Sequence, residues 1–183
     1  MKRLHLLLSI LPVFVYGQWQ QVGPPDIEAV KIIFDIDGNG SNLICASDGF
    51  YTNVSETWEY FTVDGLSARD ACKLDAERTL IIFGEYQEYR NYVHNNLIIT
   101  DGLYCFNSVT LELELLEFFD SPLFIKYNFI TDSYLLGTEN YVYHSENGFD
   151  WTLFKPHYLQ FEKMYYSMDY INSHMVIGSN RTY

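Results

Sequence analysis

The chain has 183 residues, of which 48% are hydrophobic and 17% aromatic, and its formal net charge at pH 7 is −13. This apolar content excludes wholesale disorder, and the length predicts one compact domain. The negative charge argues against partners such as nucleic acid or an anionic membrane surface, because their phosphate groups would repel the chain.

Residues 1–17 have the pattern of a secretory signal peptide. Lys2 and Arg3 precede a short apolar run, and Gly17 suits cleavage before Gln18. Because a membrane span needs about 20 apolar residues, cleavage is favoured over an uncleaved anchor. We therefore expect a secreted, extracellular protein, or a periplasmic or cell-surface one in a bacterium. We expect no membrane insertion after signal cleavage.

Three cysteines, Cys45, Cys72 and Cys105, occur in this exported chain. An odd number allows at most one internal disulfide, and one thiol is then left over. Three free thiols buried on strands are favoured over one bridge, but both states stay open. Three N-x-S/T sequons, at Asn39, Asn53 and Asn180, are glycan sites if the host is eukaryotic.

Short segments rich in branched and aromatic residues predict β-strands along the chain. Each is bounded by Gly, Asn, Asp or Ser, and no long helical pattern with caps occurs. The segment 110–115 alternates polar and apolar residues, which places Glu112 and Glu114 on one face of a strand. The clearest other strands are 30–34, 43–46, 124–129, 134–137 and 175–178.

Tyrosines after short turns recur with a period of roughly 40 residues, which is typical of four-stranded propeller blades. Large apolar residues follow them at a similar spacing, and Trp19 fits the same place in an earlier unit. Residues 18–183 are therefore predicted as an all-β, propeller-like array of about four four-stranded antiparallel blades. The recurring residues are Tyr51, Tyr104, Tyr143 and Tyr183, followed by Trp58, Leu111 and Trp151.

The last unit of this repeat stops at Tyr183, before its third strand. We therefore expect an incomplete or open array, from a truncated gene product or an unclosed sheet stack. An open end exposes unpaired backbone and promotes self-association.

The unit from Ala68 to Asp120 is longer than its neighbours, and the excess lies around residues 84–96. Its tyrosines, Tyr86, Tyr89 and Tyr92, are candidate binding residues, because loops on rigid scaffolds often carry binding side chains. The alternative is a solvated loop without function.

The segment from Ser145 to Trp151 has the form S-x-N-G-x-x-W. Ser145 and Asn147 can bond to nearby backbone, Gly148 supplies a positive φ, and Trp151 can bury a large ring. The segment resembles the Asp-box, or bacterial neuraminidase repeat, a hairpin motif of β-propeller blades. In an earlier unit only the tryptophan of this motif is present, as Trp58. The resemblance implies a structural role for these residues, away from the ligand surface.

The segment Asp35-Ile36-Asp37-Gly38-Asn39-Gly40 is the candidate metal loop. Alternating Asp and Asn oxygens beside glycines are what a Ca²⁺ loop needs, but the bidentate Glu of an EF-hand is missing. The alternative is a hairpin turn without metal. Apart from calcium at Asp35, Asp37 and Asn39, no cofactor is expected.

Two functions are compatible with the resemblance. A sialidase needs several arginines that converge on a carboxylate of the substrate, whereas the chain after residue 17 contains only four arginines. No residue stands out as catalytic. We therefore expect a secreted non-catalytic domain that binds an extracellular protein or glycan. The alternative is a fragment or divergent member of an Asp-box glycoside hydrolase, sialidase-like or glucanase-like.

Overall fold

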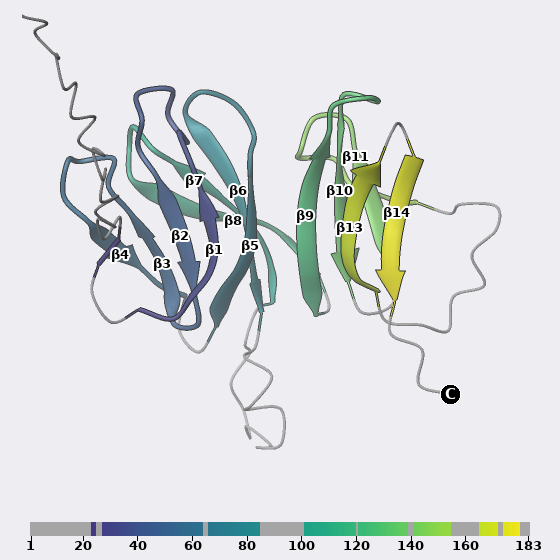
Figure 1. Ribbon diagram of the computed structural model, residues 1–183, viewed down its shortest axis with the longest axis horizontal. Helices are drawn as coiled ribbons and strands as arrows, with labels where there is room; N and C mark the ends of the chain where they lie inside the picture. The colour runs from purple at the N-terminus through teal and green to yellow at the C-terminus, as the bar shows by residue number, and fades with distance from the viewer. Residues whose placement is uncertain are drawn as a thin grey trace, which may run out of the picture.

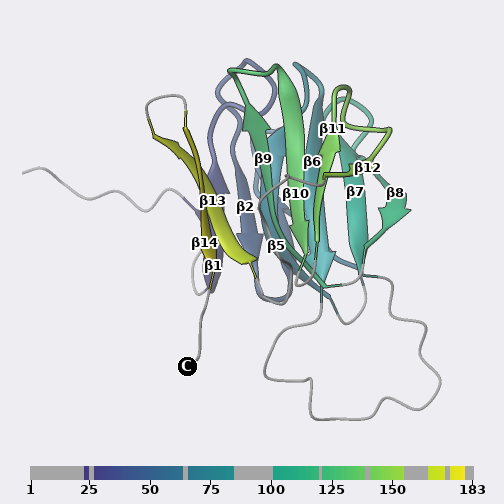
Figure 2. The ribbon, with the colours of Figure 1, turned by 90° about the vertical axis from the view of Figure 1, so that its right-hand side faces the viewer.

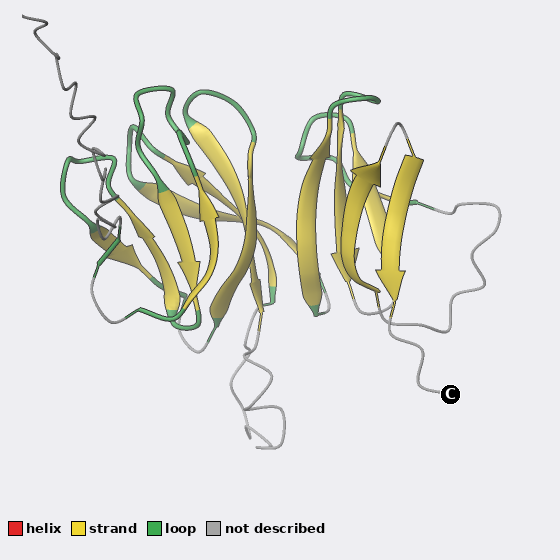
Figure 3. Cartoon of the chain, in the orientation of Figure 1, coloured by secondary structure: helices red, strands yellow, loops and turns green. Residues whose placement is uncertain are grey.

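The computed structural model describes residues 23–24, 27–63, 66–84, 101–119, 121–138 and 141–154, and the backbone of 165–171 and 174–179. Within these ranges every regular element is a β-strand (Figure 3). No helix that is long and apolar enough to cross a membrane occurs in them. The predicted signal peptide, the tyrosines at 86, 89 and 92, and Asn180 lie outside the described residues.

The strands form antiparallel sheets in which neighbours in the chain are neighbours in the sheet. The first sheet is β1 (Ala29–Ile33), β2 (Leu43–Ala46), β3 (Gly49–Thr52) and β4 (Glu59–Phe61). The second is β5 (Ser67–Lys73), β6 (Arg78–Gly84), β7 (Gly102–Asn107) and β8 (Glu112–Phe118). The third is β9 (Pro122–Asn128), β10 (Ser133–Thr138), β11 (Val142–Ser145) and β12 (Thr152–Leu153). Two strands of a fourth are described, β13 (Tyr165–Ile171) and β14 (His174–Ser179).

The sheets follow one another in chain order, as the colours of Figures 1 and 2 show. Their first strands lie side by side, β1 beside β5, β5 beside β9, and β9 beside β13. No strand pairing joins two sheets in the described part of the chain. The prediction of an all-β, open, propeller-like array of four-stranded antiparallel blades is thereby confirmed, with a fourth sheet of two described strands.

The repeat read from the sequence corresponds to the strand order of each sheet. Tyr51, Tyr104 and Tyr143 lie on β3, β7 and β11, which are the third strands of their sheets. Trp58, Leu111 and Trp151 each stand immediately before the fourth strand of their sheet. They therefore occupy equivalent positions in the three sheets, at the end of the turn that leads into that strand.

The cores lie between successive sheets, and β6 contributes to both. Ile81 and Phe83 face the first sheet, and in this core Phe50 of β3 packs on Phe106 of β7 with ring centroids 5.1 Å apart. The alternate residues of β6 face the third sheet, because successive side chains of a strand point to opposite sides. This double burial explains why β6 reads as a continuous apolar run. The second core consists mainly of Leu80, Ile82, Leu103, Ile125 and Leu136.

The three cysteines are free thiols on β2, β5 and β7. Cys45 and Cys105 are buried, and Cys72 is half-buried. Burial raises the pKa of all three thiols, that of Cys72 to about 11, so each stays protonated at neutral pH. They behave as small apolar side chains and not as nucleophiles.

Asp70 on β5 connects the first strands of three sheets. Its carboxylate pairs with the ammonium of Lys31 on β1 and accepts the backbone N–H of Ile125 on β9 at 3.0 Å. Asp70 is buried, with 5% of its surface exposed. Burial acts to lower the pKa of Lys31, but the charge of Asp70 and the hydrogen bond to it together outweigh burial, and the net pKa is raised. Lys31 therefore keeps its charge at neutral pH.

Candidate functional site

In each of the first three sheets, the turns that join the first to the second strand, and the third to the fourth strand, lie at the same end of the sheet. We call this end the turn edge; it is at the top of Figure 1. Turns of the second and third sheets meet there, and Lys73 reaches across to donate to the carbonyl of Asp35 in the first sheet at 2.6 Å. The turn edge therefore brings together residues that are far apart in the sequence.

The hairpin between β11 and β12 is held by its own side chains. The Ser145 hydroxyl accepts the backbone N–H groups of Asn147 and Gly148, at 3.3 and 2.8 Å. The Asn147 side-chain oxygen accepts those of Phe149 and Asp150, both at 2.9 Å. These four bonds satisfy consecutive turn amides and fix the hairpin without help from the neighbouring sheet.

The same hairpin packs on the second sheet. Gly148 has φ of 80°, and a Cβ there would stand 2.6 Å from the side chain of Leu74. Trp151 donates its indole N–H to the Gly148 carbonyl at 3.1 Å and meets the Phe119 ring edge-on, at 6.1 Å between centroids. The structure thus places Gly148 and Trp151 against a neighbouring sheet, where they hold two sheets together.

A cleft of about 530 Å³ opens between the second and third sheets at the turn edge. Its walls come from the β5–β6 and β9–β10 turns and from the β11–β12 hairpin. The lining combines charged side chains of both signs with two tyrosines and a leucine. The lining residues are Lys73, Leu74, Asp75, Arg78, Tyr127, Asp132, Tyr134, Glu146 and Asn147.

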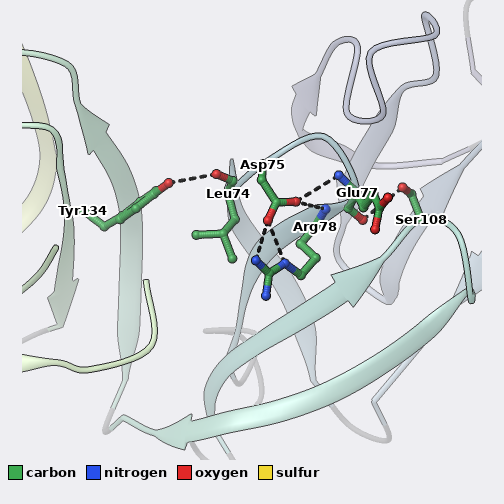
Figure 4. A network of polar contacts seen from close by, with 6 residues as sticks. All are labelled: Leu74, Asp75, Glu77, Arg78, Ser108 and Tyr134. Carbon is green, nitrogen blue, oxygen red and sulfur yellow. Dashed lines mark hydrogen bonds and ion pairs between the residues drawn. The ribbon is translucent and has the colours of Figure 1, made fainter. Parts of the chain in front are cut away.

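One wall of the cleft is built around Asp75 (Figure 4). Its carboxylate accepts the backbone N–H groups of Glu77 and Arg78, at 2.9 and 2.8 Å, and pairs with the Arg78 guanidinium. Burial acts to raise the pKa of Asp75, but these hydrogen bonds outweigh it and lower the pKa. Asp75 is therefore an ionised, oriented carboxylate and not a proton donor at neutral pH. Arg78 also lies over the Phe149 ring, 5.0 Å from its centroid.

The opposite wall is aromatic. Tyr134 is buried and donates its hydroxyl to the Leu74 carbonyl at 3.0 Å, which ties the two walls together (Figure 4). Tyr127 has 40% of its surface exposed and donates to the Asp132 carboxylate. The two rings lie 5.1 Å apart. The cleft thus combines an exposed aromatic face with fixed charged groups, which is a combination that polar ligands require.

The candidate calcium loop lies in the β1–β2 turn of the first sheet. Asp35 accepts the Gly40 N–H at 2.9 Å, and Asp37 accepts the N–H groups of Asn39 and Ser41, at 2.9 and 3.1 Å. Among the described residues, no three His, Cys, Asp or Glu side chains lie close enough together to hold a metal ion. The loop oxygens already have backbone partners, which is the arrangement of a hairpin turn.

The other predicted residues lie apart from the cleft. Asn39 is exposed, whereas Asn53 is half-buried and accepts the Asn42 N–H at 2.6 Å through its side-chain oxygen. Trp58 is half-buried beside β4. Of the residues singled out in the sequence that the structure describes, only Asn147 lines the cleft.

The residues that line the cleft were missed because they are spread over three separate turns. Asp75 and Arg78 do carry a local signal, because an Asp three residues before an Arg is typical of a short turn in which the two side chains form an ion pair. Tyr127 and Tyr134 read only as strand residues. Their meeting with Asp75 depends on how the third sheet packs on the second.

A comparison of the chain with protein-family models and with curated proteins finds no match. The resemblance to the Asp-box therefore rests on the residues of the β11–β12 hairpin alone.

Proposed function

We propose that this protein is a secreted, non-catalytic domain that binds a glycan or protein partner through the cleft at the turn edge. The observation that carries the proposal is the exposed ring of Tyr127, which lines the same cleft as the Asp75–Arg78 pair. Sugars and peptide side chains both bind where an aromatic face stands beside oriented hydrogen-bonding groups. The secretory signal pattern of residues 1–17 supports an extracellular partner.

Two carboxylates of the cleft, those of Asp75 and Asp132, support binding over glycoside hydrolysis. A glycosidase needs one carboxylic acid that keeps its proton until it donates it to the leaving group. The pKa of Asp75 is lowered, and its oxygens already accept two backbone N–H groups and pair with Arg78. Asp132 accepts the Tyr127 hydroxyl. These groups are suited to holding a ligand in position.

A sugar array, with a hydrolase assay on the same sugars, tests the proposal. We expect the full-length mature chain to bind a subset of sugars without releasing products. Tyr127→Ala should abolish this binding, whereas Tyr60→Ala should not, because Tyr60 is exposed on the first sheet, outside the cleft. Product release by the wild-type chain would support the hydrolase alternative instead. Binding to proteins in a matched protein array, without binding to sugars, would show that the partner is a protein and not a glycan.

A further inference from the structure

The outer edge of the second sheet is the longest outer edge among the described sheets. β8 has seven residues, whereas the corresponding strands β4 and β12 have three and two. Natural sheets protect their outer edges by keeping edge strands short, because a long free edge offers unpaired N–H and C=O groups. Within the described residues, β8 pairs only with β7. No described strand occupies its other edge, where one more strand can be added.

The glutamates of β8 all lie on the face that looks toward the third sheet. Glu112, Glu114 and Glu117 stand opposite Asn107, Cys105 and Leu103 in the β7–β8 pairing. Directly opposed residues share one face of an antiparallel sheet, and Cys105 and Leu103 belong to the second core.

A β-bulge keeps the third glutamate on this face. The register shifts between Leu103 and Tyr104, so that Leu116 is an extra residue on β8 and Glu117 returns to the side of Glu114. All three glutamates are exposed, while Leu116 packs against the second core. The three carboxylates therefore form an exposed row on β8, next to the apolar side chain of Leu116.

A groove of about 670 Å³ runs beside this row. Glu112, Glu114 and Leu116 line it from β8, and Phe149 lines it from the β11–β12 hairpin. Arg78 is its only cation among the lining residues, and Asp75 neutralises that charge. The contact of Arg78 with Phe149 lies between this groove and the cleft proposed above as the ligand site.

We propose that β8 accepts an extended, basic peptide segment of another protein as an additional strand, with its Lys or Arg side chains opposite Glu112, Glu114 and Glu117. Main-chain hydrogen bonds to the free edge provide the affinity, and alternate side chains of the added strand fall on the glutamate face. A second copy of β8 is a poor occupant, because it would place like charges opposite each other. The strong negative charge of the whole chain also attracts basic partners.

Fluorescence anisotropy with the full-length chain tests this proposal. The probe is a labelled synthetic peptide in which Lys and Thr alternate. We expect it to bind, and to protect the amides of β8 from hydrogen exchange. The double variant Glu112→Gln/Glu114→Gln should bind about tenfold more weakly, since two exposed ion pairs are lost. The matched variant Glu56→Gln, which removes a charge in the β3–β4 turn, should bind as the wild type does.

Two control peptides separate strand addition from simple charge attraction. A Glu–Thr peptide of the same length should not bind. An analogue with every backbone amide N-methylated keeps the charges but has no N–H to donate, and it should also fail to bind. Equal binding by the methylated analogue, no effect of the double variant, or no binding of the Lys–Thr peptide would each overturn the proposal. None of these results would affect sugar binding at the cleft, because its test depends on Tyr127.

Discussion

The carboxylate of Asp70 on β5 accepts the backbone N–H of Ile125 on β9 at 3.0 Å, so a side chain of one sheet satisfies the main chain of the next. The same carboxylate holds the Lys31 ammonium of the first sheet. One buried group therefore sets the spacing of three first strands that share no strand pairing.

Asp70→Ala should lower the free energy of unfolding by about 2–4 kcal/mol, less than a fully buried pair because Lys31 is partly exposed. The substitution leaves an unpaired ammonium and an unsatisfied N–H. Asp70→Asn should cost less, because its amide oxygen can still accept from Ile125. Urea denaturation measures both, and equal stabilities for Asp70→Ala and the wild type would contradict the role of Asp70.

Trp151→Ala should destabilise the chain by about 2–4 kcal/mol, because it removes a half-buried ring that packs on Phe119 between the second and third sheets. Trp58→Ala, at the equivalent place in the first sheet, is the matched control. We expect a smaller loss there, since Trp58 is not among the side chains that pack on either described core. An unchanged denaturation midpoint for Trp151→Ala would show that the ring has no packing role.

Calcium should not change the melting temperature, because the oxygens of Asp35 and Asp37 already accept backbone N–H groups. Thermal melts with excess calcium and with chelator measure this, since a bound ion would stabilise the native state by RT ln(1 + [L]/Kd). A calcium-dependent rise that Asp37→Ala abolishes would establish a metal site at this loop.

Acid should weaken the same loop. Burial acts to raise the pKa of Asp37, but hydrogen bonds from Ser41 and Asn39 outweigh it and lower the pKa. The carboxylate therefore contributes stability above its ordinary pKa of 3.8, and this contribution is lost as the pH falls through the lowered value. Between pH 7 and acid, the melting temperature should fall less for Asp37→Asn than for the wild type. Parallel pH profiles for the two proteins would contradict this expectation.

Self-association through the open end of the array should occur between copies of this chain. Val30, Ile32 and Phe34 on and beside β1 expose 54, 41 and 67% of their surfaces. Because contiguous exposed apolar groups promote association, Ile32→Lys should shift the sedimentation of the chain toward monomer. Val109→Lys, in an exposed turn of the second sheet, is the control and should have no such effect. A wild-type chain that sediments as a stable monomer would rule out the association.

The fold was predictable because its signals are local. Strand segments, turn residues and the tyrosine repeat each depend on residues close together in the chain, and they predicted the all-β class, the four-stranded blades and the recurrence of Tyr51, Tyr104 and Tyr143 from one blade to the next. The Ser145–Trp151 hairpin could be read for the same reason, since its hydrogen bonds lie within a few residues.

The cleft, the Asp70 connection and the groove beside β8 were decided only by the tertiary structure. Asp75 and Tyr127 are far apart in the sequence, and nothing local indicates that their sheets pack with these turns together. Lys31 and Asp70 each read as an ordinary charged residue, and their pairing follows from β1 lying beside β5. Glu112 and Glu114 were placed on one strand face by their alternation, but Glu117 joined them only through a bulge that depends on the register with β7. Side-chain alternation is a property of the strand itself, whereas register and sheet packing are set by the hydrophobic contacts of distant segments.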